Sequence, residues 1–600
     1  MTEILDDATR KLLDDKTKDF QRLQKQKAHA NGGVEARILT AYAFLDGEQY
    51  TDYAGKTLAV EVFDKNKLYL VFNLIQQRAN KLLGRLASMN PPFKSRPDRK
   101  DPKAFSEAEI VDRMILALDE KLGQPTLTWE MFWHLVTGGV AFEHIPWIPD
   151  ATVEPVPQFD DFGKELLFKD LLMDDQVVTE SQMLEMVTSQ GRAPEGFELL
   201  EEVQLVGDVG AEILGGLNVF VDQSVKSLRN LAPNQYVYIA KIRSQAWIED
   251  NFGWEAIEGL ESDSDLKIVT TTFNQTGPSS GGGILKDLIP LVQGTRSDDD
   301  PLMNIVVEGY APSSKKYPRG KRCIFIPGKR MLHEGDNEYE EIPIVDYHWR
   351  PVTTTFWTSG YVNGLIAPQR FINKRLSQLG EQANAGIYSP LLLGPGLDPK
   401  DIPTDFPGAV KHGINDQGIP NVQRLDAPNM PSWFLNSLEM VVKLFNDMAG
   451  GADLFQENKY PGQLRGPSAV PMLQEILDTE WGPLYNHVGE RMSLSKQMRL
   501  NRVKQFYPPV RTMHYTDRDQ KDEVLVFHTE KILRSGTNFN VTVERGALLP
   551  ELRALREARV SERLMGPLSI LYLDERTGRL DKSKIAADLQ FGDEIGRAHV

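Results

Sequence analysis

The side chains of this sequence that could do chemistry are mainly grouped carboxylates. They are the run Asp298, Asp299 and Asp300 and the pair Asp174 and Asp175. Carboxylates in such groups can hold the two metal ions of a nuclease, which stabilise the attacking and leaving oxygens of a phosphodiester. Both groups lie in polar, loop-like sequence, where neighbouring acidic residues are usually solvated. We therefore expect no metal there, and a metal-dependent nuclease or other nucleic-acid enzyme remains the alternative function.

Other patterns typical of enzymes are missing from the sequence. The histidines form no His-x-x-x-His or His-Glu-x-x-His pattern, and the glycine run 281–283 lacks the Lys-Ser/Thr of a phosphate-binding loop. The one cysteine, Cys323, excludes an intramolecular disulfide, and its apolar surroundings predict a buried structural thiol. We expect the chain to be no enzyme and to need no cofactor or metal.

The strongest cluster of positive charge surrounds Tyr317. It consists of Lys315, Lys316, Arg319, Lys321 and Arg322. Such a cluster could contact nucleic acid. The turn residues Pro318 and Gly320 favour a solvent-exposed hairpin turn instead, with a strand resuming at Cys323.

The overall charge also bears on nucleic acid. The 600 residues include 68 basic and 85 acidic side chains, for a net charge of -17. A protein that grips DNA tightly is usually basic, whereas a mostly acidic channel can let a duplex slide without trapping it. No window reaches the roughly 18–20 apolar residues of a membrane span, and the charged N-terminus is unlike a secretory signal. We expect a chain that is made in a reducing cytoplasm and makes no contact with membrane.

The elements that would position these residues follow an unusual order between 342 and 508. A strand over 342–349 precedes a helix over 363–386, a loop rich in Gly and Pro with short strands over 387–431, a second helix over 432–449, a glycine-broken loop over 450–467 and a long helix from 468 to 506. The first helix places Leu365, Ile372, Leu376 and Leu379 on one face. The second does so with Phe434, Leu438, Val441, Phe445 and Met448, and the third with Leu473, Ile476, Leu477, Leu484, Val488 and Met492. Pro483 predicts a kink in the third helix.

The rest of the chain is less regular. We expect a charged helix over 2–27, mainly helices over 34–149, an acidic insertion over 153–209 with one helix at 181–189, and strands with helices over 218–269. A flexible loop is expected over 274–300, because it contains Gly277-Pro278 and the run Gly281-Gly282-Gly283.

This order of elements resembles the middle of a portal protein of tailed bacteriophages. Other segments resemble the same family: Phe44 to Tyr50, which contains Gly47 and Gln49, then Asn73 before a helix, and the strand Val307-Glu308-Gly309-Tyr310. The resemblance implies an α+β, multi-domain portal fold, mainly helical, with wing, stem, clip and crown regions. The regions would be 1–362 for the N-terminal and wing part, 363–386 and 432–449 for the stem helices, 387–431 for the clip, 450–467 for the tunnel loop, 468–547 for the long wing helix and wing strands, and 548–594 for the crown.

The function implied by the resemblance is that of a channel. Portal subunits form a ring, here expected to be a dodecamer, at one vertex of the capsid in the virion, after assembly in the host bacterial cytoplasm. Double-stranded DNA passes through during packaging and ejection, in transient contacts that ignore sequence. The implied protein partners are the terminase, the major capsid and scaffolding proteins and the head-to-tail connector proteins. A connector or tail structural protein without a channel is a further alternative.

The candidate contacts with DNA also follow from the resemblance. In the tunnel loop they are Gln456, Lys459, Gln463 and Arg465, and on the first stem helix they are Arg370, Lys374 and Arg375. Cationic groups would meet phosphates and amides would add weak contacts. The alternatives are an ordinary helix connection for the loop and a solvated polar face for the helix.

The last six residues raise a separate question. A DNA sequence that resembles a common sequencing adapter can encode residues 595–600, so this segment is expected to be an artefact that truncates the crown. A genuine polar C-terminus is the alternative.

Overall fold

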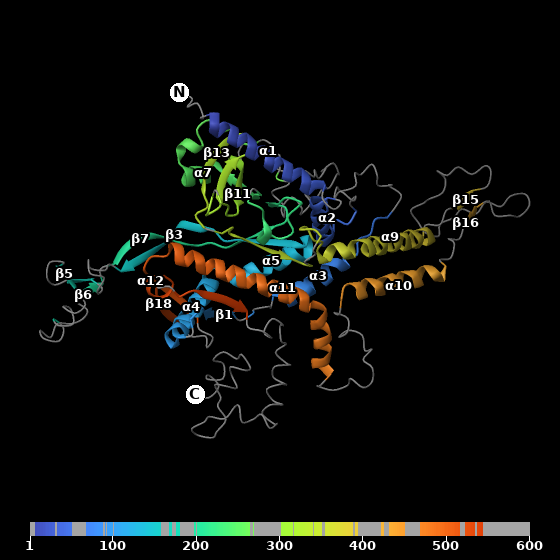
Figure 1. Cartoon of the computed structure of the whole chain (residues 1–600). Coiled ribbons are helices and arrows are strands. Elements are labelled where there is room, and N and C mark those ends of the chain that lie inside the picture. The colour runs from blue at the N-terminus through green and yellow to red at the C-terminus, as the bar shows by residue number, and fades with distance from the viewer. Residues whose placement is uncertain are drawn as a thin grey trace, which may run out of the picture.

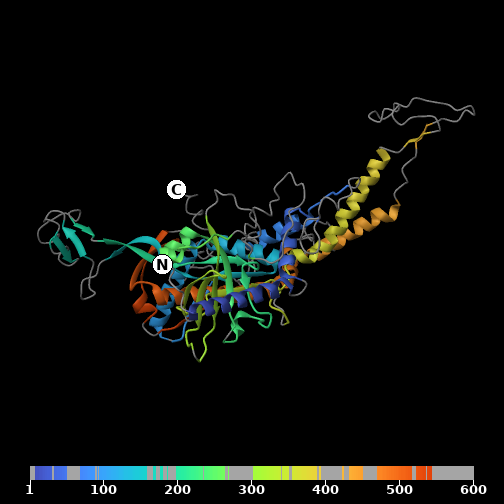
Figure 2. The ribbon, with the colours of Figure 1, turned by 90° about the horizontal axis from the view of Figure 1, so that it is seen from above.

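The structure is a computed structural model of the chain. It describes residues 7–29, 33–50, 68–87, 91, 93–99, 101–157, 167–170, 176–179, 186, 197–199, 201–233, 235–263, 268, 302–315, 317–339, 341–350, 354–387, 391–393, 422–424, 431–450, 469–516, 522–534 and 537–543. These residues form a body of mixed helices and sheets from which two hairpins project in opposite directions (Figure 1, Figure 2). The α+β class expected from the sequence is confirmed at this level.

One layer of the body is an antiparallel sheet of five strands in the order β13-β12-β11-β10-β9. The strands are β9 (Val219–Phe220), β10 (Val237–Ser244), β11 (Met303–Ala311), β12 (Lys321–Ile326) and β13 (Arg330–Asp336). Alternate side chains of a strand point to opposite faces, so each face needs its own cover. Helix α1 (Asp7–His29) covers one face through Phe20 and Leu23, and α7 (Gln245–Phe252) with η5 (Trp254–Ala256) covers the other. The charged N-terminal helix expected over 2–27 is thus confirmed as α1.

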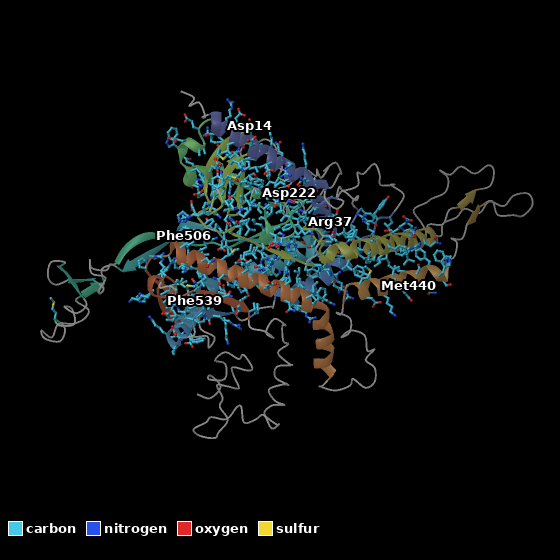
Figure 3. All side chains as sticks on the ribbon, in the orientation of Figure 1. Asp14, Arg37, Asp222, Met440, Phe506 and Phe539 are labelled. Carbon is cyan, nitrogen blue, oxygen red and sulfur yellow. The ribbon has the colours of Figure 1, made fainter. Side chains whose placement is uncertain are left out.

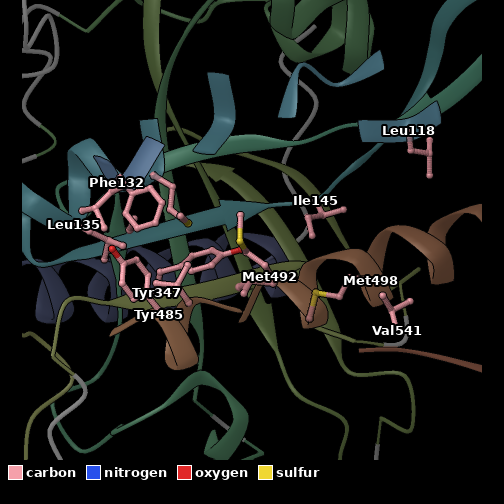
Figure 4. Close-up of a cluster of buried hydrophobic side chains, with 14 of the residues drawn as sticks. Leu118, Phe132, Leu135, Ile145, Tyr347, Tyr485, Met492, Met498 and Val541 are labelled. Carbon is pink, nitrogen blue, oxygen red and sulfur yellow. The ribbon is translucent and has the colours of Figure 1, made fainter. Parts of the chain in front are cut away.

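The largest core lies beneath the long helix α11 (Ala469–Phe506). It joins α2 (Val34–Asp46), α3 (Leu74–Ala87), α5 (Gln124–Gly138) and the sheet β14-β2-β8. The strands of this sheet are β2 (Val140–His144), β8 (Glu212–Gly215) and β14 (Ile344–His348), so β14 confirms the strand expected over 342–349. Figure 4 shows Tyr485 and Met492 of α11 beside Tyr347 of β14 and Phe132 of α5.

The expected apolar face of α11 is confirmed where its side chains are described. Leu484, Val488 and Met492 are buried. The helix contains Pro483, and its first part turns away from the rest (Figure 1), as expected for a proline that removes a backbone donor.

The C-terminal part of the described chain closes on the N-terminal part. Strand β1 (Phe93–Pro97) pairs antiparallel with β19 (Phe539–Val543), so Ser95 lies opposite Val541. Beside this pair lie α4 (Pro102–Lys121), the hairpin of β17 (Val510–Thr516) and β18 (Asp522–His528), and α12 (Thr529–Ile532). A 3-10 turn, η4 (Leu228–Asn230), completes the body.

The first projecting hairpin is built from β3 (Trp147–Pro157) and β7 (Glu201–Val209). It leads to a small sheet of β4 (Leu167–Asp170), β5 (Gln176–Thr179) and β6 (Phe197–Leu199) in the order β5-β4-β6. The acidic insertion expected over 153–209 is therefore largely β where it is described. Of the helix expected at 181–189, only Met186 lies within the described residues, and it is helical.

The second projecting hairpin contains the helices α9 (Tyr361–Ile387) and α10 (Ser432–Met448). Between them a ribbon of β15 (Leu391–Leu393) and β16 (Val422–Arg424) is described. Helices expected over 363–386 and 432–449 and short strands expected in 387–431 are confirmed as elements. The expected flexible loop 274–300, the loop 451–467 and the segments 548–594 and 595–600 lie outside the described residues.

Candidate functional site

Helices α9 and α10 pack against each other as an antiparallel pair. At the body, the Tyr361 hydroxyl on α9 donates a 2.7 Å hydrogen bond to the Ala449 carbonyl just after α10. Farther out, the Arg375 guanidinium lies 5.0 Å from the centre of the Phe434 ring. Phe445 of α10 is completely buried, because it joins the core beneath the pair. The hairpin is thus fixed to the body at one end, and its other end projects away from the body.

The three basic residues of α9 that we expected at a channel lie in different surroundings. Arg370 is half-buried over the Phe44 ring, at 5.1 Å, and Arg375 lies between Phe371, at 4.9 Å, and Phe434. Lys374 is exposed to solvent. Arginine stacks well on aromatic faces, so Arg370 and Arg375 help to pack the hairpin, and of the three Lys374 presents its charge most openly.

The other four candidates, Gln456, Lys459, Gln463 and Arg465, all lie outside the described residues. Their contact with DNA stays a prediction.

A row of exposed apolar side chains follows one face of α10. These residues, which we name the α10 stripe, are Trp433, Met440, Leu444 and Met448, with exposed fractions of 60%, 64%, 46% and 56%. Steps of seven and four residues return to the same face of a helix, so the four side chains form one continuous strip. Figure 3 shows Met440 on the projecting hairpin.

The stripe corrects part of the sequence interpretation of α10. Phe434 and Phe445 are buried as expected, and Leu438 and Val441 are partly buried, but Met448 points to solvent. Two apolar periodicities run side by side on this helix, and Met448 belongs to the exposed one rather than to the packed one. The signal that could have revealed the stripe is the spacing of Trp433, Met440 and Leu444.

On its other side α9 binds an extended segment over 68–72 through a ladder of hydrogen bonds. The backbone N–H groups of Leu68, Leu70 and Phe72 donate to Glu381 Oε1, Ser377 Oγ and Asn373 Oδ1 at 2.9, 2.9 and 3.2 Å. Four residues of helix and two residues of extended chain both advance about 6 Å. Every second N–H of the segment therefore meets a side chain one turn farther along α9.

The same ladder explains two sequence features that the family resemblance rested on. Asn373 also donates to Gln49 Oε1 at 2.5 Å, and Gln49 donates to Asn73 Oδ1 at 2.9 Å. Asn73 in turn accepts from the Gln76 N–H at 3.0 Å and so caps the start of α3. Gln49 and Asn73 are therefore structural residues that fix α9 to the body. Their partners on α9 were not predicted, although polar residues at 369, 373, 377 and 381 recur every four positions.

A buried ionic network holds α11 on the central sheet. Arg499 donates to Glu143 Oε1 of β2 at 2.6 Å and to Asp119 Oδ1 of α4 at 3.0 Å, and Lys496 also binds Asp119. Glu143 further accepts from the hydroxyls of Ser495 and Tyr347 at 2.6 and 2.7 Å. Burial acts to raise the pKa of Glu143, but the Arg499 charge and these hydrogen bonds outweigh it and hold the pKa below its ordinary value. The apolar spacing of α11 dominates its sequence pattern, and this cationic face was not predicted from it.

The basic cluster around Tyr317 is a hairpin turn between β11 and β12, as expected. Gly320 ends the turn with a φ of 83°, a left-handed conformation that favours glycine. Lys321 lies 4.1 Å from the centre of the Tyr317 ring, and Arg322 pairs with Glu308 at 2.8 Å. Cys323 is buried beside them, and burial raises the pKa of its thiol to about 12, which suits an inert structural residue.

In the part of the chain that the structure describes, no group of three or more His, Cys, Asp or Glu side chains is placed to hold a metal ion. Asp174, Asp175 and Asp298 to Asp300 lie outside that part. Among the helices that the structure describes, none combines the length and apolar character of a membrane span.

Comparison with known proteins adds no identification. Neither a scan against protein-family models nor a search of the curated proteins found a match to this chain.

Proposed function

We propose that the chain is the portal subunit of a tailed bacteriophage, one member of a ring through which double-stranded DNA enters and leaves the capsid. The observation that carries the proposal is the projecting pair α9 and α10, in which α10 is apolar on its packed face and again along the α10 stripe. The apolar surface of α10 is therefore wider than the face that α9 covers. An exposed apolar strip on a helix is normally buried against a partner. In a ring, neighbouring subunits would cover it.

The order of elements along the chain supports the same proposal. A strand in the core, a projecting helix, a small ribbon, a returning helix and a long bent helix follow one another from β14 to α11. They correspond to the wing strand, first stem helix, clip, second stem helix and wing helix of the resemblance. The net charge of -17 suits a channel in which DNA slides rather than a surface that grips it.

The roles of the other regions and of the partners complete the proposal. The ring, expected to be a dodecamer, would sit at a capsid vertex of the virion, with terminase and head-to-tail connectors docking at the clip end. Scaffolding and major capsid proteins would surround the wing. The terminase would supply ATP hydrolysis, and the portal itself would catalyse no reaction.

The test is the assembly state of the purified chain. Light scattering after size-exclusion chromatography and negative-stain imaging should show closed rings. Burial of one stripe side chain contributes about 1.5–3 kcal/mol, so the double change Met440→Glu and Leu444→Glu should yield folded monomers. Trp254→Glu is the matched control, because Trp254 is 60% exposed but lies on η5, far along the chain from the hairpin. A parent protein that stays monomeric at high concentration would contradict the proposal.

The nuclease alternative has its own test. The purified chain should not cut DNA in the presence of magnesium. If it does, and if replacement of Asp298, Asp299 and Asp300 by asparagine abolishes the cutting, the nuclease is the correct function.

A further inference from the structure

We infer that neighbouring subunits meet head to tail across α9, with Phe72 of one subunit packed on the α10 stripe of the next. We name the exposed surface of Phe72 the Phe72 patch. The inference rests on the proposed ring and goes further, because it states which two surfaces of the chain form each contact. A second copy of this chain is the partner.

The two surfaces are both apolar and both uncovered. Phe72 is 48% exposed, although its backbone N–H and carbonyl are both bound by side chains of α9. A continuous apolar strip such as the α10 stripe marks an interaction site, and exposed aromatic rings are enriched in contacts between proteins.

The Phe72 patch and the α10 stripe lie on opposite sides of α9. Asn373 binds the Phe72 backbone, whereas Arg375 stacks on Phe434 of α10. Asn373 and Arg375 are two positions apart, and each position turns a helix by about 100°, so their side chains point about 200° apart around α9. The extended segment and α10 therefore lie on nearly opposite sides of α9. A single chain cannot bring its own two surfaces together. Contact between them requires a second subunit, and the second then offers its free surface to a third.

The two surfaces also lie at the same level along the hairpin. Tyr361 of α9 is level with Ala449, and Arg375 is level with Phe434, so the two helices run antiparallel residue by residue. Asn373, which holds Phe72, is therefore within one turn of the level of Met440 on α10. Rotation about an axis parallel to the hairpin keeps every residue at its level, so Phe72 of one subunit would reach Met440 of the next.

A contact of this heterologous type closes into a ring when the rotation from one subunit to the next divides a full turn, whereas contact of two α10 stripes with each other would give a two-fold dimer.

Cysteine cross-linking tests the contact directly, because Cys323 is the only native cysteine and can be replaced by alanine. In that background, a chain with both Phe72→Cys and Met440→Cys should form, on oxidation, a ladder of covalent dimers, trimers and higher multimers on a denaturing gel. Each single variant alone should form none. A mixture of the two single variants should stop at dimers.

The possible failures are distinguishable. Rings in the electron microscope without the Phe72–Met440 cross-link would overturn this inference and leave the proposed function standing. Dimers from Met440→Cys alone would show that α10 stripes face each other and would also overturn it. Absence of rings would refute both proposals.

Discussion

Phe20 holds α1 on the five-stranded sheet, and its replacement by alanine should release that helix from the body. The ring is 4% exposed and packs edge-on against Phe220 and Tyr238, with centroids 5.0 and 6.0 Å apart. A buried Phe→Ala change costs about 3–5 kcal/mol, because it loses apolar burial and leaves a cavity. Most of this cost should appear as easier undocking of α1, since the side chain joins that helix to the sheet.

Cys323 reports this undocking, because it lies in the same apolar cluster beneath α1. Its raised pKa, about 12 when α1 is docked, leaves almost no reactive thiolate at pH 8, so a thiol reagent should label it only after the helix opens. A change of 3 kcal/mol corresponds to labelling that is on the order of 100-fold faster. Ile248→Ala is the matched control, because Ile248 is fully buried in the cluster on the opposite face of the sheet. Equal acceleration in the two variants, or none in Phe20→Ala, would refute separate opening of α1.

Three further predictions concern other parts of the chain. Lys27 is fully buried, and burial lowers its pKa from 10.5 to about 7. Between these two pH values the unfolded chain binds one more proton than the folded chain, so the free energy of unfolding should rise as the pH increases from 7 to 10. Lys27→Met should remove that part of the rise, as measured by denaturant titrations at each pH. Arg499→Met should lower the free energy of unfolding by about 3–5 kcal/mol, because it leaves Glu143 buried without its cation, and a denaturation midpoint equal to the parent's would show that the network is unimportant. Changing Lys459 and Arg465 to alanine should alter stability by no more than about 0.5 kcal/mol and leave rings intact, yet impair DNA packaging or retention; normal packaging would show that these cations do not meet DNA.

Elements with one dominant period could be predicted from the sequence. The helices α9, α10 and α11 and the strand β14 begin and end within a few residues of the expected positions, because amphipathic spacing, prolines and glycines are local signals. The insertion after Trp147 was harder. Its short strands and many charges give no clean alternation, and the pairing of β3 with β7 joins residues about fifty positions apart.

The candidate site was predictable only in part. Lys374 and the two arginines of α9 were found by charge, but the local pattern could not say that Arg370 and Arg375 would stack on Phe44 and Phe434. Likewise, the sequence of α11 alone suggests a solvated basic face. Its partners Glu143 and Asp119 lie more than 350 residues earlier in the chain, so local spacing could not reveal them. The exposure of the α10 stripe depends on what packs on the helix, and sequence periodicity carries no such information.

The pairing of β1 with β19 sets the order of events during synthesis. Strand β1 ends at Pro97, but its partner begins at Phe539, so the ribosome must add more than four hundred residues before the two can meet. At about 5–20 residues per second this wait lasts on the order of tens of seconds. Both projecting hairpins, including the apolar α10, emerge in that interval on a body that cannot yet close. Nascent chains should therefore be most prone to aggregation, and most dependent on chaperones, before β19 has been translated.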